Sequence, residues 1–134
     1  IAGAGAAGGL GFGLMTFARA KIRAGVEIVI EETGLAEKIA QSDYVFTGEG
    51  GIDFQTKFGK TPFGVAQVAM RFNKPVIAFA GYVGEGIEEL YDEGFTAIFG
   101  IVDGACDYQT ALKNGERNLE RCCESVARIL AITS

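Results

Sequence analysis

The sequence has 134 residues, which is enough for one compact domain and too few for two ordinary ones. Its 12 basic and 17 acidic residues give a net charge of −5, and an acidic balance without basic runs argues against a dedicated nucleic-acid-binding protein. Apolar residues make up 49% of the chain, but no run approaches the ~18 consecutive positions of a membrane span. We therefore expect one globular domain over residues 1–134 that contacts neither nucleic acid nor membrane.

Histidine is absent and cysteine is scarce. Without histidine the chain can form neither a His-Ser-Asp nor a His-Cys catalytic pair, nor a zinc site with a histidine ligand. Cys106, Cys122 and Cys123 leave at least one thiol unpaired and contain no Cys-x-x-Cys spacing. We expect all three to be reduced, small apolar residues of a cytoplasmic protein, with Cys122 and Cys123 packed in the core.

The predicted elements alternate between helices and short apolar strands. The first helix is expected from Gly8 to Ala20, and Val26 to Ile30 fits either a strand or a helix. Strands are expected at 44–47, 76–80 and 97–101, and further helices at 35–40, 61–72, 87–93 and 109–131. Because no hairpin signals separate the strands, the pattern predicts an α/β fold: a mainly parallel sheet in a three-layer αβα arrangement.

The closing helix over residues 109–131 is amphipathic. Its charged face is expected to be solvated and its apolar stripe to pack on the sheet. The stripe consists of Leu112, Leu119, Cys122, Cys123, Val126 and Leu130.

The segment from Gly48 to Lys60 is the candidate site. Parallel sheets bind ligands beyond the carboxyl ends of their strands, and this connection of thirteen residues exceeds the usual ~2–6. Glu49 and Asp53 suit Mg²⁺ or a substrate hydroxyl, while Lys60, with Lys57, suits phosphate. A solvated surface loop with incidental charges is the alternative.

Neutral groups in the same segment add to this interpretation. Gln55 and Thr56 offer hydrogen bonds, and the next helix is expected to begin with Thr61 as its cap and Pro62 in its first turn. The free amides at such a helix start attract anions. Gly59-Lys60-Thr61 ends like a Walker A loop, but Phe54 stands where that motif needs glycine.

The chain opens on Ile1 and runs directly into a glycine-rich turn, with no element before it. We expect a piece of a longer polypeptide. Gly3, Gly5 and Gly8 fit the Gly-x-Gly-x-x-Gly dinucleotide fingerprint, but the strand that should precede it is absent. The turn is expected to hold a phosphate or carboxylate with its amides; a tight packing turn is the alternative.

Four motifs occur in an order that resembles the first, bacterial type of glycerate kinase family. They are Gly3-Ala4-Gly5-Ala6-Ala7-Gly8-Gly9-Leu10-Gly11, Thr47-Gly48-Glu49-Gly50, Asp53-x-Gln55-Thr56-x-x-Gly59-Lys60-x-Pro62-x-Gly64-Val65-Ala66 and Lys74-Pro75-Val76-Ile77-Ala78. The likeness spans nearly the whole chain, which resembles the C-terminal portion of such a kinase. It implies a two-domain α/β kinase with its active site between the domains.

The resemblance implies ATP- and Mg²⁺-dependent phosphorylation of D-glycerate, at the 2-hydroxyl to give 2-phosphoglycerate. Asp53, Lys60 and Glu49 are then the expected catalytic residues, and Glu49 and Asp53 the expected Mg²⁺ ligands. Phosphate and glycerate would be bound by Gly3, Gly5, Gly8, Gly48, Gly50, Gln55, Thr56 and Gly59. The remainder of the polypeptide would complete the site. The sequence leaves open whether the protein forms an oligomer.

Two other functions remain open at this point. A nicotinamide-dependent oxidoreductase is supported by the glycine fingerprint alone, and a non-catalytic domain for small acids could use the same loop without transferring phosphate.

Overall fold

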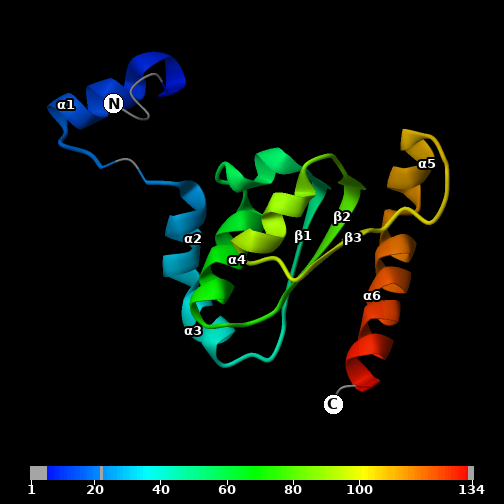
Figure 1. Ribbon diagram of the computed structural model, residues 1–134. Helices are drawn as coiled ribbons and strands as arrows, with labels where there is room; N and C mark the ends of the chain where they lie inside the picture. Colours follow the sequence, from blue (N-terminus) through cyan, green and yellow to red (C-terminus); the bar gives the residue numbers. More distant parts are fainter. Residues whose placement is uncertain (1–5, 22, 133–134) are drawn as a thin grey trace.

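The computed structural model describes residues 6–21 and 23–132 and shows a parallel sheet between two layers of helices (Figure 1). The sheet contains β1 (Val45–Ile52), β2 (Val76–Val83) and β3 (Ala97–Gly100), in the order β1-β2-β3. Val45 pairs with Val76, and β2 in turn pairs in parallel with β3. The predicted three-layer α/β fold is confirmed.

Helices cover both faces of this sheet (Figure 1). One face carries α2, α3, α4 and the 3-10 helix η3, and the other carries α6. Within the described residues no helix is long and apolar enough to cross a membrane. The α-helices are α1 (Leu10–Phe17), α2 (Gly25–Thr33), α3 (Leu35–Ala40), α4 (Thr61–Arg71), α5 (Tyr108–Lys113) and α6 (Gly115–Ile132); the 3-10 helices are η1 (Ala6–Gly9), η2 (Phe54–Lys57) and η3 (Ile87–Glu93). The ambiguous segment around Val26 is therefore helical.

The core is divided by the sheet. On the α4 face Val68, Val76 and Leu90 are almost completely buried. On the α6 face Phe79 stacks on Phe99 at 6.0 Å between ring centroids, and the cluster is closed by α6. The cluster on the α4 face contains more buried residues than the cluster on the α6 face. Helix α4 and the end of β1 therefore lie on the better-packed side of the sheet.

The strand β1 is longer than predicted, which corrects the expected boundaries of the site. It runs on to Ile52, so Glu49 and Gly50 belong to the sheet and only residues 53–60 form the connection to α4. Glycines permit this extension: a Cβ at Gly81 would lie 2.9 Å from the carbonyl oxygen of Gly50. Close approach of the two backbones thus takes the place of side-chain packing.

The predicted helix over residues 109–131 is also wrong in its continuity. It is broken into α5 and α6 at Asn114, whose φ of −94° and ψ of 5° leave the helical region. The Asp107 carboxylate caps α5 by accepting a hydrogen bond from the Thr110 amide at 2.7 Å. Gly115, a poor helix former, follows the break and lets α6 take its own direction.

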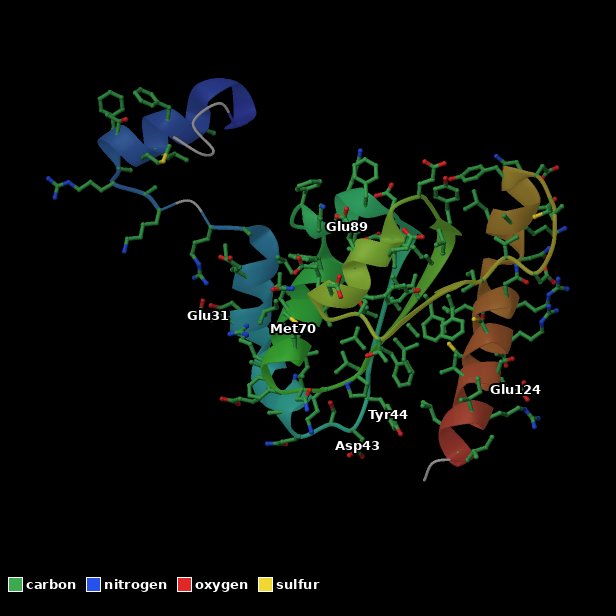
Figure 2. The ribbon with its side chains drawn as sticks, viewed as in Figure 1. Glu31, Asp43, Tyr44, Met70, Glu89 and Glu124 are labelled. Atoms are coloured by element: carbon green, nitrogen blue, oxygen red, sulfur yellow. The ribbon has the colours of Figure 1, made fainter. Side chains whose placement is uncertain are left out.

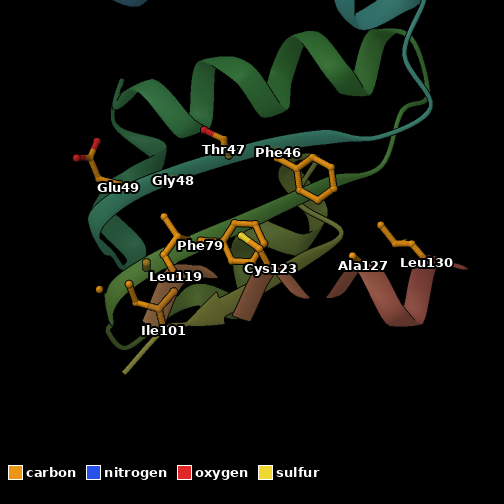
Figure 3. A pocket seen from close by; sticks show the side chains of 12 residues that line it. Phe46, Thr47, Gly48, Glu49, Phe79, Ile101, Leu119, Cys123, Ala127 and Leu130 are labelled. Carbon is orange, nitrogen blue, oxygen red and sulfur yellow. The ribbon is translucent and has the colours of Figure 1, made fainter. Parts of the chain in front are cut away.

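The apolar stripe of α6 faces the sheet but is not fully covered. Val126 is buried and Cys122 half-buried, whereas Leu119 stays 41% exposed and Cys123 is exposed. Leu119 and Cys123 border a groove of about 740 Å³ between α6 and the strands β1 and β2, which we call the α6 groove (Figure 3). Glu49 lies at one end of it.

The prediction that Cys122 and Cys123 both pack in the core is wrong for Cys123. Cys106 and Cys123 are exposed, and all three thiols are free. Burial raises the pKa of the Cys122 thiol above its usual value, which keeps this half-buried side chain protonated and apolar.

Helix α1 lies apart from the three layers (Figure 1). Its apolar residues have no partner surface among the described residues: Phe17 is 87% exposed, and Leu10, Phe12 and Leu14 are exposed as well. The amphipathic helix expected after the glycine turn is thus present but shorter, and the described residues leave its apolar side uncovered.

Candidate functional site

The connection between β1 and α4 is organised by Asp53, the first residue after β1. Its Oδ1 accepts a hydrogen bond from the Gln55 amide at 2.8 Å, and its own amide donates to Thr56 Oγ1 at 3.2 Å. These two bonds form a reciprocal cap on η2. The Asp53 carboxylate is therefore held in one place while part of it stays accessible.

Lys60 brings positive charge to this carboxylate. Its Nζ lies 3.9 Å from Asp53 Oδ1, with 41% of the lysine and 30% of the aspartate side chain exposed. An ion pair this exposed contributes little to the free energy of unfolding. Stability therefore does not explain why Lys60 lies beside Asp53. This contact places the carboxylate of Asp53 and the ammonium of Lys60 side by side.

The start of α4 differs from the prediction by one position. Lys60, not Thr61, is the cap residue, with extended φ and ψ of −72° and 153°, and Pro62 lies in the first turn. The preceding Gly59 has a φ of 91°, which favours glycine and turns the chain into the helix. The lysine side chain has no acceptor atom, so it cannot cap the free amides of Thr61 and Phe63 in the first turn of α4.

Lys57 is engaged elsewhere. Its Nζ forms an ion pair with Glu89 of η3, which Figure 2 labels, and lies 5.5 Å from the centre of the Phe58 ring. Lys57 therefore fastens η2 to η3 and leaves Lys60 as the cation beside Asp53.

The neutral loop residues take different positions. Thr56 is completely buried, where its hydroxyl serves the Asp53 cap, whereas the Gln55 side chain is exposed beside the carboxylate. The structure thus presents Gln55 at the surface of the loop and encloses Thr56 beneath it.

Glu49 projects from β1 at the border of the α6 groove (Figure 3). It is exposed, and its Oε1 accepts a long hydrogen bond of 3.3 Å from the Gly50 amide. Gly48 belongs to the same stretch of strand, where a Cβ would lie 3.1 Å from the carbonyl oxygen of Phe79. Glycine at position 48 is therefore explained by strand packing.

The described residues include only the last part of the glycine turn. Gly3 and Gly5 lie outside the described residues, and Gly8, with a φ of 65°, precedes the separate helix α1. The anion site expected at this turn therefore stays a prediction.

No group of three or more Cys, His, Asp or Glu side chains in the described part of the chain could enclose a metal ion. Mg²⁺ rarely needs such an enclosure, because it keeps several waters and binds through one or two carboxylates together with substrate phosphates. Glu49 and Asp53 each offer an accessible carboxylate of this kind, although Glu49 lies within β1 and Asp53 follows its end.

The sequence did not reveal that the exit of β2 contacts the site. The Gly84 amide donates to the Ile52 carbonyl at 2.8 Å, which holds this exit against the end of β1. A Cβ at Gly84 would lie 2.8 Å from the Asp53 Cβ and 3.1 Å from Tyr82 Cε1. The glycine cluster over residues 81–86 was the available signal, because it follows a strand at the ligand-binding edge.

We expect Gly84→Ala to displace Asp53. The added methyl group meets a Cβ and a ring atom at distances that require movement, which should cost about 1–3 kcal/mol of stability. Urea unfolding of the full-length protein measures this. Gly25→Ala is the matched control, because a Cβ there meets nothing within 4 Å. Equal stability of the two variants would show that Asp53 is not wedged against this glycine.

Several known proteins are similar to this chain. The sequence profile of the Glycerate kinase family matches residues 1–131. A glycerate kinase of Haemophilus influenzae is 46% identical over 130 residues, covering 97% of this chain and 34% of that protein. A glycerate 2-kinase of Escherichia coli is 39% identical over 132 residues, covering 98% of this chain and 35% of that protein.

A solved structure is similar as well. A crystal structure from Salmonella typhimurium LT2, of a protein assigned as glycerate kinase 2, matches with a TM-score of 0.75 and 42% identity. The match covers 99% of this chain and 34% of that one, so the chain spans about a third of the length of its relatives. Since the family profile extends over nearly every residue, the chain belongs to the glycerate kinase family.

Proposed function

We propose that this chain is part of a longer, two-domain cytoplasmic kinase that transfers the terminal phosphoryl group of ATP to D-glycerate. The observation that carries the proposal is the Asp53–Lys60 pair at the start of α4, in a chain that matches the glycerate kinase family from residue 1 to residue 131. The names of the relatives support the substrate, and the loop supplies charges that phosphoryl transfer needs.

Lys60 is proposed to stabilise the negative charge of the transferring phosphoryl group. Its ammonium stands at the first turn of α4, where the Thr61 and Phe63 amides add further partial positive charge. Asp53 keeps the ammonium near the end of β1. Such preorganised charges act without reorganisation during the reaction.

Asp53 and Glu49 are proposed to hold Mg²⁺ together with the phosphates of ATP. The ion, when bound, would supply the positive charge that offsets the β- and γ-phosphate oxygens. Asp53 is suited to this because the η2 cap fixes its carboxylate, and Glu49 because its carboxylate is exposed at the end of the α6 groove.

The other predicted residues are proposed either to contact the ligands directly or to hold the site in shape. Gln55 and the backbone at Gly59 are proposed to bind the anionic end of the ligands, and Gly48 and Gly50 to hold β1 close to β2. Thr56 is proposed to act through Asp53, whose amide donates to its hydroxyl. Anion binding by the glycine turn at Gly3, Gly5 and Gly8 stays a prediction.

Glycerate-dependent ADP release by the full-length protein tests the activity. The nicotinamide alternative is not favoured by the family match, and thermal-shift measurements with NAD and with ATP separate the two. Stabilisation by NAD alone, without glycerate-dependent ADP release, would contradict the proposal. A binding domain would likewise show no turnover.

The 2-hydroxyl is the proposed acceptor, in keeping with the name of the Escherichia coli relative. Phosphorus NMR of the product decides this, because a phosphate on the secondary carbon couples to one proton and a phosphate on the primary carbon to two. A doublet is expected, and a triplet would show phosphorylation at the 3-hydroxyl instead.

We expect Asp53→Asn to weaken the response to Mg²⁺. Asparagine can still cap η2, so the loop keeps its shape while one metal ligand loses its charge. The Mg²⁺ concentration that gives half-maximal activity should rise roughly tenfold or more. Asp43→Asn, an exposed aspartate that precedes β1 at its opposite end (Figure 2), is the control. An unchanged Mg²⁺ titration for Asp53→Asn would exclude the metal role.

A further inference from the structure

A second cavity lies at the carboxyl ends of the strands, beside the proposed phosphoryl-transfer loop. It has a volume of about 780 Å³, in the range of small-molecule sites, and opens between the strand ends and α5. Its walls include the backbone at Gly81, Gly100 and Gly104 and the side chains of Tyr82, Tyr108 and Leu112. We call this cavity the carboxyl-end crevice.

The side chains that line the crevice offer no positive charge to an anionic occupant. None of the described residues that line it is Lys or Arg, and its two acids are Glu49 and Asp107. The Asp107 carboxylate already accepts a hydrogen bond from the Thr110 amide, which lowers its pKa below the usual value and keeps it anionic. Glycerate and phosphate would meet no positive side chain here, whereas an uncharged group would meet mostly apolar surface.

Two aromatic side chains line the crevice. Tyr82 and Tyr108 are 65% and 73% exposed, so much of each side chain is accessible to a ligand. Aromatic side chains of this kind bind nucleobases by stacking, because every base has a π-face. The glycines that line the crevice also allow a ring to approach the backbone closely.

The crevice adjoins the loop that carries Lys60. Gly84 stands between Tyr82 and Asp53: its Cβ position would be 3.1 Å from the tyrosine ring and 2.8 Å from the aspartate Cβ. A molecule with an uncharged aromatic end and an anionic end could therefore lie with one end in the crevice and the other at Asp53 and Lys60. The α6 groove does not offer this, because it extends along α6 toward Leu130.

We propose that the carboxyl-end crevice binds the adenine ring of ATP, with Tyr82 and Tyr108 as stacking residues. This inference rests on the proposed kinase function and assigns the two substrates to different places. The base occupies the crevice, and the phosphates extend past Tyr82 toward Lys60, where glycerate must meet them.

Steady-state kinetics of the full-length protein test this assignment with two independent changes. Tyr82→Ala removes one stacking face and should raise the KM for ATP about tenfold, with the KM for glycerate within twofold of wild type. Gly104→Trp fills the crevice instead; a Cβ at Gly104 meets nothing within 4 Å, so the backbone accommodates it, and the KM for ATP should rise at least as much. Tyr82→Phe should restore the wild-type value.

Tyr91→Ala is the matched control, because Tyr91 is 44% exposed but does not line the crevice. Calorimetric titration with a non-hydrolysable ATP analogue should show the same weakening for Tyr82→Ala and Gly104→Trp. Unchanged ATP affinity in both Tyr82→Ala and Gly104→Trp would overturn the inference, as would a rise confined to the KM for glycerate. In either case, glycerate-dependent turnover by the wild-type protein would leave the proposed kinase function intact. Absence of wild-type turnover would instead contradict the proposed function itself.

Discussion

The isolated 134-residue chain is expected to release no glycerate-dependent ADP above background, although it folds. It spans about a third of the length of its relatives, and under the proposed function the rest of the longer polypeptide completes the site. The described residues also leave the apolar side of α1 uncovered and the α6 groove open. Since phosphoryl transfer depends on positioning, and a small misplacement alone can cost ~10²-fold, the loss should be far larger than that.

The measurement compares the purified chain with the full-length protein under identical conditions. Circular dichroism verifies that the chain is helical, so that inactivity is not simply a failure to fold. Activity within tenfold of the full-length protein would show that these residues contain the complete site.

Lys60→Ala in the full-length protein is expected to lower kcat by about 10²-fold or more. The change removes the ammonium that stands 3.9 Å from Asp53 Oδ1 at the start of α4, and losing one preorganised charge contact has an effect of this order. Stability should scarcely change, because the pair is largely solvated.

Two lysine controls accompany this variant. Lys38→Ala removes an exposed lysine of α3 and should leave kcat unchanged. Lys57→Ala breaks the ion pair with Glu89 and should affect activity less than Lys60→Ala does. A kcat for Lys60→Ala within threefold of wild type would exclude Lys60 from the site.

The sequence predicted the parallel sheet correctly, because a strand that is buried on both faces can be recognised from its own run of apolar residues. Buried runs such as 76–80 have no polar alternation, which is the mark of a parallel strand covered on both faces. It could not predict where β1 ends, because that depends on the approach of Gly81 to Gly50, two residues far apart in the chain.

The same distinction applies to the candidate site. Asp53 and Lys60 are seven positions apart in one connection, so their charges could be related from the sequence alone. Thr56 is predicted to be a ligand contact because a hydroxyl in a loop offers hydrogen bonds. Its burial could not be predicted, because it depends on the folding of residues 54–57 into η2, which turns this side chain inward. Tyr82 and Gly84 were missed because only the extension of β2 brings them to Asp53.

The most direct test of the proposed site is a double-mutant cycle on Asp53 and Lys60 in the full-length protein, with glycerate-dependent ADP release as the readout. Wild type should turn over, and each of Asp53→Ala and Lys60→Ala should lose about 10²-fold. The double variant should be much less impaired than the product of the two losses, because the residues act as a unit. No glycerate-dependent turnover by wild type, or losses that multiply independently, would contradict the assignment of phosphoryl transfer to this pair.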